Sequence, residues 1–172
     1  MAFLISCNVY RCLFASCSAL KYFVYNSTAS THVEYTVFDR CVLTGKGTTD
    51  NILVGTFSSQ NRVCNNLFTN CHGNGSGGTR QSLIEERQNN FIGIVQNNAV
   101  WNCTGSLATR ISKTGTNSLY YGQNPVTELT ETPWKNDDGI IANAMTSYEY
   151  KPSYLLRNKN VLLSDISGLV AV

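Results

Sequence analysis

The sequence predicts an all-β fold built as a solenoid of about six similar rungs, in a single domain that spans residues 1–172. The composition, a repeated motif and the spacing of its copies carry this prediction. The chain has 19 Asn, 16 Ser, 17 Thr and 13 Gly, which are turn residues, and only 14% charged residues. Hydrophobic residues still make up 42%, which excludes a disordered polar chain.

A nine-residue motif recurs four times without gaps. It consists of an apolar residue, three variable residues, two apolar residues, two variable residues and a Cys. Its copies are Val9–Cys17, Val33–Cys41, Val63–Cys71 and Val95–Cys103. Leu156–Ser164 is a weaker fifth copy, with Ser in the place of Cys. The Cys residues of the four copies lie 24, 30 and 32 residues apart, a period that is typical of solenoids, propellers and repeat arrays.

The repeat unit has the composition of strands rather than helices. Short β-branched and aromatic runs, such as 51–57, 91–95 and 118–121, alternate with Gly and Asn. A strand-only unit of about 30 residues fits one rung of a parallel β-helix, in which each side chain stacks on its equivalent in the next rung. The alternative is a β-sandwich in which the motif matches are coincidental.

In such a stack, Cys17, Cys41, Cys71 and Cys103 should form a ladder at a tight corner. Asn70 and Asn102 directly precede two of these residues, and amide side chains suit corners because they satisfy turn backbone. The total of seven Cys is odd, and the chain lacks the doubled Cys-x-x-Cys arrangement of a structural zinc site. We therefore expect buried free thiols, with no metal and no cofactor.

The rungs are expected near 3–29, 30–59, 60–90, 91–122, 123–150 and 151–172. Met1–Cys7 is interpreted as a first strand rather than a signal peptide, because it lacks a basic region and its apolar run is short. The Gly-rich stretch His72–Gly78 predicts a loop that leaves the third rung. Ser82–Glu85 has capping-box spacing, which predicts a helical turn or two around 83–88. A short helix or loop insertion is thus expected near 72–90.

Charge and hydropathy exclude two classes of partner. The formal net charge is only +2, whereas nucleic-acid-binding proteins normally carry a basic face. No stretch approaches the 18 apolar residues of a membrane span. We expect neither nucleic-acid binding nor membrane insertion.

The strings at 65–71 (Asn-Asn-Leu-Phe-Thr-Asn-Cys) and 97–103 (Asn-Asn-Ala-Val-Trp-Asn-Cys) resemble a known group, the right-handed parallel β-helix proteins. These include pectate-lyase-like polysaccharide lyases and hydrolases and the spikes and fibres of phage tails. The resemblance covers most of the chain, from about residue 7 to 163. It implies a right-handed coil and says little about activity, because one fold hosts many functions.

The resemblance implies that a lyase would need carboxylates for Ca²⁺ with an Arg or Lys base, and that a hydrolase would need two or three close carboxylates. The catalytic candidates are Asp39, Arg40, Glu85, Glu86 and Asp137. Asp39 and Arg40 are expected to form a solvated pair. Glu85 and Glu86 should lie on the exposed face of the short helix, and Asp137 in a turn. Hydrolysis would be favoured if two or more carboxylates lie within about 10 Å of one another in an open groove. The carboxylates considered are Asp39, Asp50, Glu85, Glu86 and Asp137.

Four aromatic side chains are candidates for stacking on sugar rings, and each also suits a core or a subunit interface. They are Trp101, Tyr120, Tyr121 and Trp134.

The sparse carboxylates and the uncapped ends of the repeat favour a non-catalytic structural or adhesive protein of a virion, such as a phage tail spike, fibre or capsid-associated component. We expect a homo-oligomer, with a trimer favoured, or other virion subunits that cover the ends, because exposed sheet edges invite pairing. A surface polysaccharide is a candidate ligand, and an extracellular location is the alternative to the virion. A polysaccharide lyase or glycoside hydrolase, or a fragment of one, is the alternative function.

Overall fold

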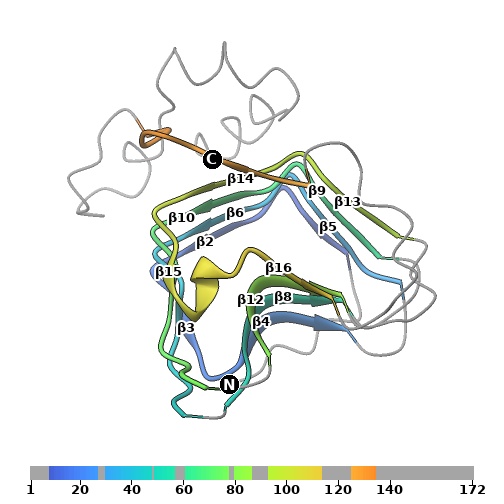
Figure 1. The fold of residues 1–172 in the computed structure, drawn as a ribbon. Helices are drawn as coiled ribbons and strands as arrows, with labels where there is room; N and C mark the ends of the chain where they lie inside the picture. The colour runs from blue at the N-terminus through green and yellow to red at the C-terminus, as the bar shows by residue number, and fades with distance from the viewer. Residues whose placement is uncertain are drawn as a thin grey trace.

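The computed structural model describes residues 8–26, 30–47, 49–56, 61–77, 80–86, 93–113 and 125–134. Within these residues, parallel strands form four sheets that enclose a common core (Figure 1). Sheet I contains β1 (Val9–Tyr10), β5 (His32–Glu34), β9 (Arg62–Cys64) and β13 (Ile94–Gln96). Sheet II contains β2 (Leu13–Ala15), β6 (Val37–Asp39), β10 (Leu67–Thr69), β14 (Asn98–Trp101) and β17 (Val126–Glu128).

The other two sheets have four strands each. Sheet III contains β3 (Ser18–Ala19), β7 (Val42–Leu43), β11 (His72–Gly73) and β15 (Thr104–Gly105). Sheet IV contains β4 (Tyr22–Asn26), β8 (Asn51–Thr56), β12 (Gln81–Glu86) and β16 (Ile111–Lys113). A 3₁₀ helix, η1 (Ser106–Ala108), lies between β15 and β16.

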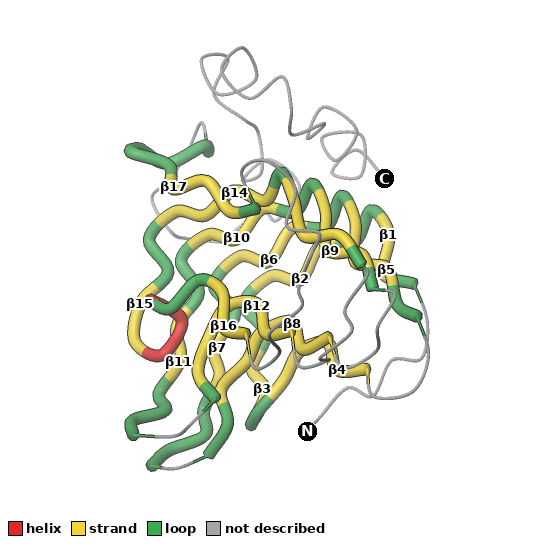
Figure 2. The backbone as a smooth tube through the Cα atoms, turned by 45° about the vertical axis from the view of Figure 1, so that its right-hand side comes forward, coloured by secondary structure: helices red, strands yellow, loops and turns green. Residues whose placement is uncertain are grey.

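The chain passes through sheets I, II, III and IV in this order four times, which gives four stacked rungs (Figure 2). Rung 1 is β1–β4, rung 2 is β5–β8, rung 3 is β9–β12 and rung 4 is β13–β16. The all-β, parallel and solenoid-like prediction is therefore confirmed, and the arrangement is compatible with a parallel β-helix. Residues 125–134 of the expected fifth rung, including β17, are described, and the expected sixth rung (151–172) lies outside the described residues.

The repeated motif predicts the strand register correctly. Val33 pairs with Val9 and with Val63, and Val63 pairs with Val95. The apolar pair of the motif is also in register, because Phe38 lies opposite Phe14 and Phe68. The three Phe rings stack inside the core, with ring centroids 4.9 Å apart for Phe14 and Phe38 and 5.1 Å for Phe38 and Phe68.

The predicted Cys ladder forms the corner between sheets II and III, named here the thiol corner (Cys17, Cys41, Cys71 and Cys103). Each thiol follows a residue with positive φ, and these residues are Ser16, Arg40, Asn70 and Asn102. The Cys71 thiol donates a hydrogen bond to the carbonyl of Phe38 in the preceding rung at 3.4 Å. Burial raises the pKa of the Cys71 thiol, and all six described cysteines are free.

A second ladder forms the corner between sheets I and II, named here the amide corner (Cys12, Thr36, Asn66 and Asn98). It too follows residues with positive φ: Arg11, Tyr35, Asn65 and Asn97. The buried Asn66 amide accepts from the Thr36 N–H at 3.0 Å and donates to the Val33 carbonyl at 2.8 Å. Asn98 repeats this role one rung later, because it accepts from the Asn66 N–H at 3.1 Å.

The helix predicted around 83–88 is wrong for the described residues, because β12 continues to Glu86 as a strand. Ser82 pairs with Ile52 and Ile84 with Val54, so the register of the stack overrides a four-residue capping pattern. The insertion expected near 72–90 also begins later than predicted, since His72–Gly73 pairs with the strands of rungs 2 and 4. The described helical structure is limited to η1, and no described helix has the length and apolar character to span a membrane.

Candidate functional site

A polar network lies on the outer face of sheet II, opposite the stacked Phe rings. Because side chains alternate along a strand, the neighbours of the inward Phe38 and Phe68 point outward. Residues 125–134, named here the strap, return across this face (Figure 1). Trp134 of the strap is buried and packs against Val37, Leu67 and Ala99 of the sheet.

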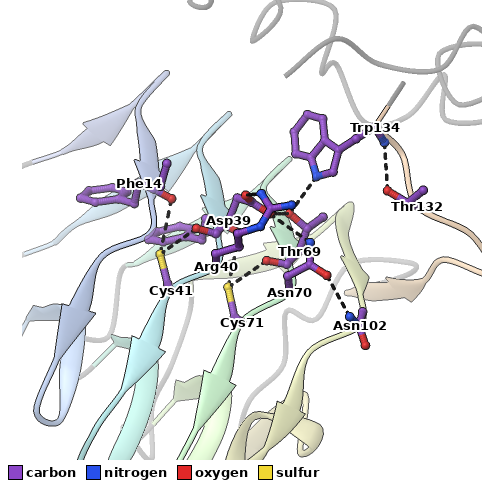
Figure 3. A network of polar contacts seen from close by, with 12 residues as sticks. Phe14, Asp39, Arg40, Cys41, Thr69, Asn70, Cys71, Asn102, Thr132 and Trp134 are labelled. Carbon is purple, nitrogen blue, oxygen red and sulfur yellow. Dashed lines mark hydrogen bonds and ion pairs between the residues drawn. The ribbon is translucent and has the colours of Figure 1, made fainter. Parts of the chain in front are cut away.

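The carboxylate of Asp39 lies at the centre of this network (Figure 3). Arg40 forms an ion pair with Asp39 Oδ2. On the other side, Thr69 Oγ1 donates to Asp39 Oδ1 at 2.5 Å, and Asn70 Nδ2 donates at 3.3 Å. The Trp134 Nε1–H donates to Thr69 Oγ1 at 3.1 Å. Asp39 is thereby linked through Thr69 to the strap, and its contacts hold two rungs and the strap together.

On this face one sequence prediction is wrong, and one choice between two alternatives is decided. Asp39 is paired with Arg40 as expected, but its side chain is 0% exposed rather than solvated. Trp134 is 2% exposed, so it is a core-like anchor of the strap and does not offer a face to a sugar. Both outcomes have one cause: the strap is distant in sequence from sheet II and covers it in space.

The remaining predicted residues are spread over the chain. Trp101 is half-buried and lies opposite Thr69 in the register of sheet II. The backbone of Glu86 ends β12, but its side chain lies outside the described residues. Tyr120, Tyr121 and Asp137 also lie outside the described residues.

Sheet IV carries a second polar cluster because its strands bend. Leu53 and Val54 are consecutive, yet both belong to the core cluster, which a straight strand does not allow. On the outer side of the same bend, the rings of Tyr22 and Tyr25 meet with centroids 4.7 Å apart. Figure 1 shows the change of direction in β4, β8 and β12.

Asp50 joins Tyr22 to rung 3 at this bend. The Tyr22 hydroxyl donates to Asp50 Oδ2 at 2.8 Å, and Arg80 Nη1 lies 3.5 Å from the same oxygen. Burial, followed by the hydrogen bond to Asp50, raises the pKa of Tyr22 above its ordinary value. The cluster combines two aromatic rings, a carboxylate and a guanidinium, which can bind hydroxyl-rich or charged groups.

Glu85 lies farther along β12, in register with Gly55 and Ser112. Its side chain is 0% exposed, so the prediction that it lies on an exposed helix face is wrong. Asp50 directly precedes β8 and pairs with Arg80, whereas Glu85 lies opposite Gly55, five residues farther along the register of sheet IV. Asp39 lies on sheet II across the core. Within the described segments, no group of three or more metal-ligating side chains gathers.

The sequence analysis did not single out the apolar surface of rung 1. Among the described residues, the exposed large hydrophobic side chains are Tyr10, Leu13 and Leu20, at 51%, 39% and 50% exposure, and all belong to rung 1. The Tyr10 ring meets Tyr35 edge-on at 5.3 Å, and the Arg11 guanidinium lies 5.2 Å from the Tyr10 ring centre. The signal available in the sequence was the first motif copy, Val9–Cys17, which contains Tyr10 and Leu13 and ends three residues before Leu20.

Comparison with known proteins adds no relative to this description. No protein-family model, no curated protein and no solved structure matches the chain.

Proposed function

We propose that this chain is a right-handed parallel β-helix protein with a structural or adhesive role in a virion, such as a phage tail spike, fibre or capsid-associated component. In this role it assembles as a homo-oligomer, with a trimer as the expected number, or packs against other virion subunits. A surface polysaccharide is a candidate ligand. An extracellular protein of the same architecture is the alternative location.

The observation that carries the proposal is the open end of the stack at rung 1. The strands β1, β2, β3 and β4 are terminal in all four sheets, so each has one edge that no described strand covers. Tyr10, Leu13 and Leu20 are exposed at this end. Uncovered sheet edges beside apolar side chains favour association with another polypeptide.

The cysteines and the Asp39 network also support a structural role. The six described thiols are free, which fits a protein that folds in a reducing compartment. The carboxylate of Asp39 is used for contacts between rungs and strap rather than being presented to solvent.

Site-specific photo-crosslinking in the assembled state tests this proposal. A photoreactive residue at Leu13 should cross-link to another polypeptide, because rung 1 is covered in the assembly. The matched control is Asn74, which is exposed on a loop of rung 3, between the two ends of the stack. A Leu13 probe that reacts only with solvent, under conditions in which the particle is intact, would contradict the proposal.

A polysaccharide lyase or glycoside hydrolase is the second candidate, and the cluster at the bend of sheet IV favours it. Asp50 and Arg80 provide a carboxylate and a base-type side chain 3.5 Å apart beside the Tyr22 hydroxyl. If this cluster is catalytic, Asp50→Asn should lower the release of sugar ends by about 100-fold or more. Glu34→Gln on sheet I is the control and should leave the rate unchanged.

A further inference from the structure

The thiol corner places an accessible cysteine next to a buried one, an arrangement typical of cysteines that sense oxidants. Cys17 of rung 1 is half-buried between the exposed residues Ser16 and Ser18, whereas Cys41 of rung 2 is fully buried. We propose that peroxide converts Cys17 and Cys41 into a disulfide that ties rung 1 to rung 2. The inference goes beyond the proposed function and does not depend on it, because it concerns the chain by itself.

The backbone holds these two cysteines side by side. β2 pairs with β6 before the corner and β3 pairs with β7 after it, so Cys17 and Cys41 occupy the same register position. The Val42 N–H donates to the Cys17 carbonyl at 2.9 Å, which fixes the corners of the two rungs against each other. Neighbouring strands lie about 4.8 Å apart. This spacing is within the range of roughly 4.4–6.8 Å that separates the Cα atoms of most disulfides.

The two sulfur atoms occupy the same part of the corner. Cys17 Sγ donates to the Ala15 carbonyl at 3.3 Å. Cys41 Sγ donates to the equivalent carbonyl of its own rung, that of Asp39, at 3.7 Å. It also donates to the carbonyl of Phe14 in rung 1 at 3.4 Å. The Cys41 thiol is therefore directed toward the rung that contains Cys17 (Figure 3).

Exposure selects Cys17 among the thiols of this corner. Cys71 and Cys103 are buried in rungs 3 and 4. Burial raises the pKa of Cys71, and contact with Cys71 together with burial raises that of Cys103. Both thiols are thus kept protonated and away from solvent, whereas peroxide reacts with accessible thiolates. Oxidation should therefore begin at Cys17.

The reaction balances with hydrogen peroxide as the oxidant. The Cys17 sulfur, as a thiolate, attacks one peroxide oxygen, and the O–O bond breaks to leave a sulfenic acid and one water. The Cys41 sulfur then attacks the sulfenic sulfur, the S–O bond breaks, and the hydroxyl leaves as water with the Cys41 proton. In sum, two thiols and one hydrogen peroxide give one disulfide and two waters, and two electrons pass from sulfur to oxygen.

Cys12 provides a matched control, because it is also a half-buried cysteine of rung 1. The residue stacked on it at the amide corner is Thr36, whose Oγ1 accepts from the Cys12 N–H at 3.5 Å. Thr36 has no thiol that could attack a sulfenic acid. Oxidised Cys12 should therefore form no link to the residue stacked on it in rung 2.

Peptide mapping of the purified full chain after peroxide treatment, without reduction, tests the inference. Trypsin releases Cys17 in peptide 12–21 and Cys41 in peptide 41–46, and these peptides should be recovered joined. Cys17→Ser and Cys41→Ser should each abolish the joined species, and Cys12→Ser should leave it unchanged. All variants carry Cys7→Ser, so that every remaining thiol is one of the six described.

A reagent that traps sulfenic acids distinguishes the two steps. Dimedone should label Cys17 in the Cys41→Ser variant, because the sulfenic acid then lacks the thiol that resolves it. Mapping of the unsubstituted chain does not depend on the folding of any variant. There, Cys17 recovered unlinked, either reduced or as the sulfinic acid, would overturn the inference, and so would a link between Cys71 and Cys103 in its place. The same yield of the joined peptides in concentrated urea would also overturn it, because the stack would then not select the pair.

Discussion

Within the described residues, rungs 1 and 4 at the two ends of the stack differ in their polar contacts and in their exposed side chains. At rung 4, Arg110 donates to the carbonyls of Cys103 and Leu107 at 2.9 and 2.7 Å and pairs with Glu128 of the strap. At rung 1, Tyr10 and Leu13 are exposed. The chain therefore satisfies one end with its own polar groups and leaves apolar side chains at the other.

Equivalent residues show how far this difference reaches. Phe38 and Cys41 of rung 2 are fully buried, whereas Phe14 and Cys17 at the same motif positions of rung 1 are only partly buried. The sequence motif is the same, so the neighbouring rung determines the burial. This is the behaviour of a linear array, in which each repeat is stabilised by its neighbours.

The largest predicted effect is a loss of stability at alkaline pH, because rungs 3 and 4 bury their thiols. Burial raises the pKa of Cys64 to about 11 and raises that of Cys71. Contact with Cys71, together with burial, raises the pKa of Cys103. The folded state thus holds protons that the unfolded chain releases above pH of about 9, so this stabilisation is complete below that pH and is lost as the pH rises toward the folded values.

By pH 10 the three thiols together should lower the free energy of unfolding by about 4 kcal/mol. Urea unfolding at a series of pH values measures the loss, and Cys64→Ala should reduce it by about a third. A free energy of unfolding that stays constant from pH 8 to 10 would show that these thiols are already accessible to water.

The second prediction removes the polar closure of rung 4. Arg110→Ala leaves the carbonyls of Cys103 and Leu107 without their donor and Glu128 without its partner. The free energy of unfolding should fall by about 3 kcal/mol. The control is Arg62→Ala. The Arg62 side chain is more exposed than that of Arg110, so loss of its pair with Glu34 should cost about 1 kcal/mol or less in urea unfolding. Equal losses for the two variants would contradict a closing role for Arg110.

The third prediction concerns the strap, which follows rung 4 in the chain. Trp134→Phe keeps an aromatic ring against Leu67 but removes the Nε1–H that donates to Thr69. The free energy of unfolding should fall by about 1.5 kcal/mol. Thermal unfolding of this variant and of a Trp101→Phe control, at a half-buried position, distinguishes the hydrogen bond from a general loss of indole.

The sequence predicted the contacts between equivalent residues of neighbouring rungs, but it did not predict the contacts made by segments distant in sequence. The motif predicted the register of four rungs because equivalent residues stack directly, so local pattern and tertiary contact coincide. It failed at Asp39, because the burial of that carboxylate depends on a strap distant in sequence. It failed at Ser82–Glu85, because the pairing of β12 with β8 outweighs a short helix-capping pattern.

The corners were only half predicted. Asn70 and Asn102 were expected at corners, and both have positive φ. Asn65 and Asn97 lie five residues earlier in the same motif copies and have the same conformation, so the spacing was available as a signal. The preference for Asn at these corner positions is not visible in rungs 1 and 2, where other residues have the positive φ. These residues are Arg11, Ser16, Tyr35 and Arg40.

The smallest predicted effect tests whether the absence of Asn from the corners of rung 1 contributes to the difference between rung 1 and rung 4. Ser16 of rung 1 has φ of 51°, the same value as Asn102 of rung 4. Asn tolerates the left-handed region better than other residues that carry a side chain, because its amide hydrogen-bonds locally. Ser16→Asn should therefore raise the free energy of unfolding by about 0.5 kcal/mol. Ser18→Asn, at an exposed strand position of the same rung, should give no gain because Asn is a poor strand residue. If both variants behave alike in urea unfolding, the corner residues of rung 1 do not limit its stability, and its open edge alone accounts for the difference between the ends.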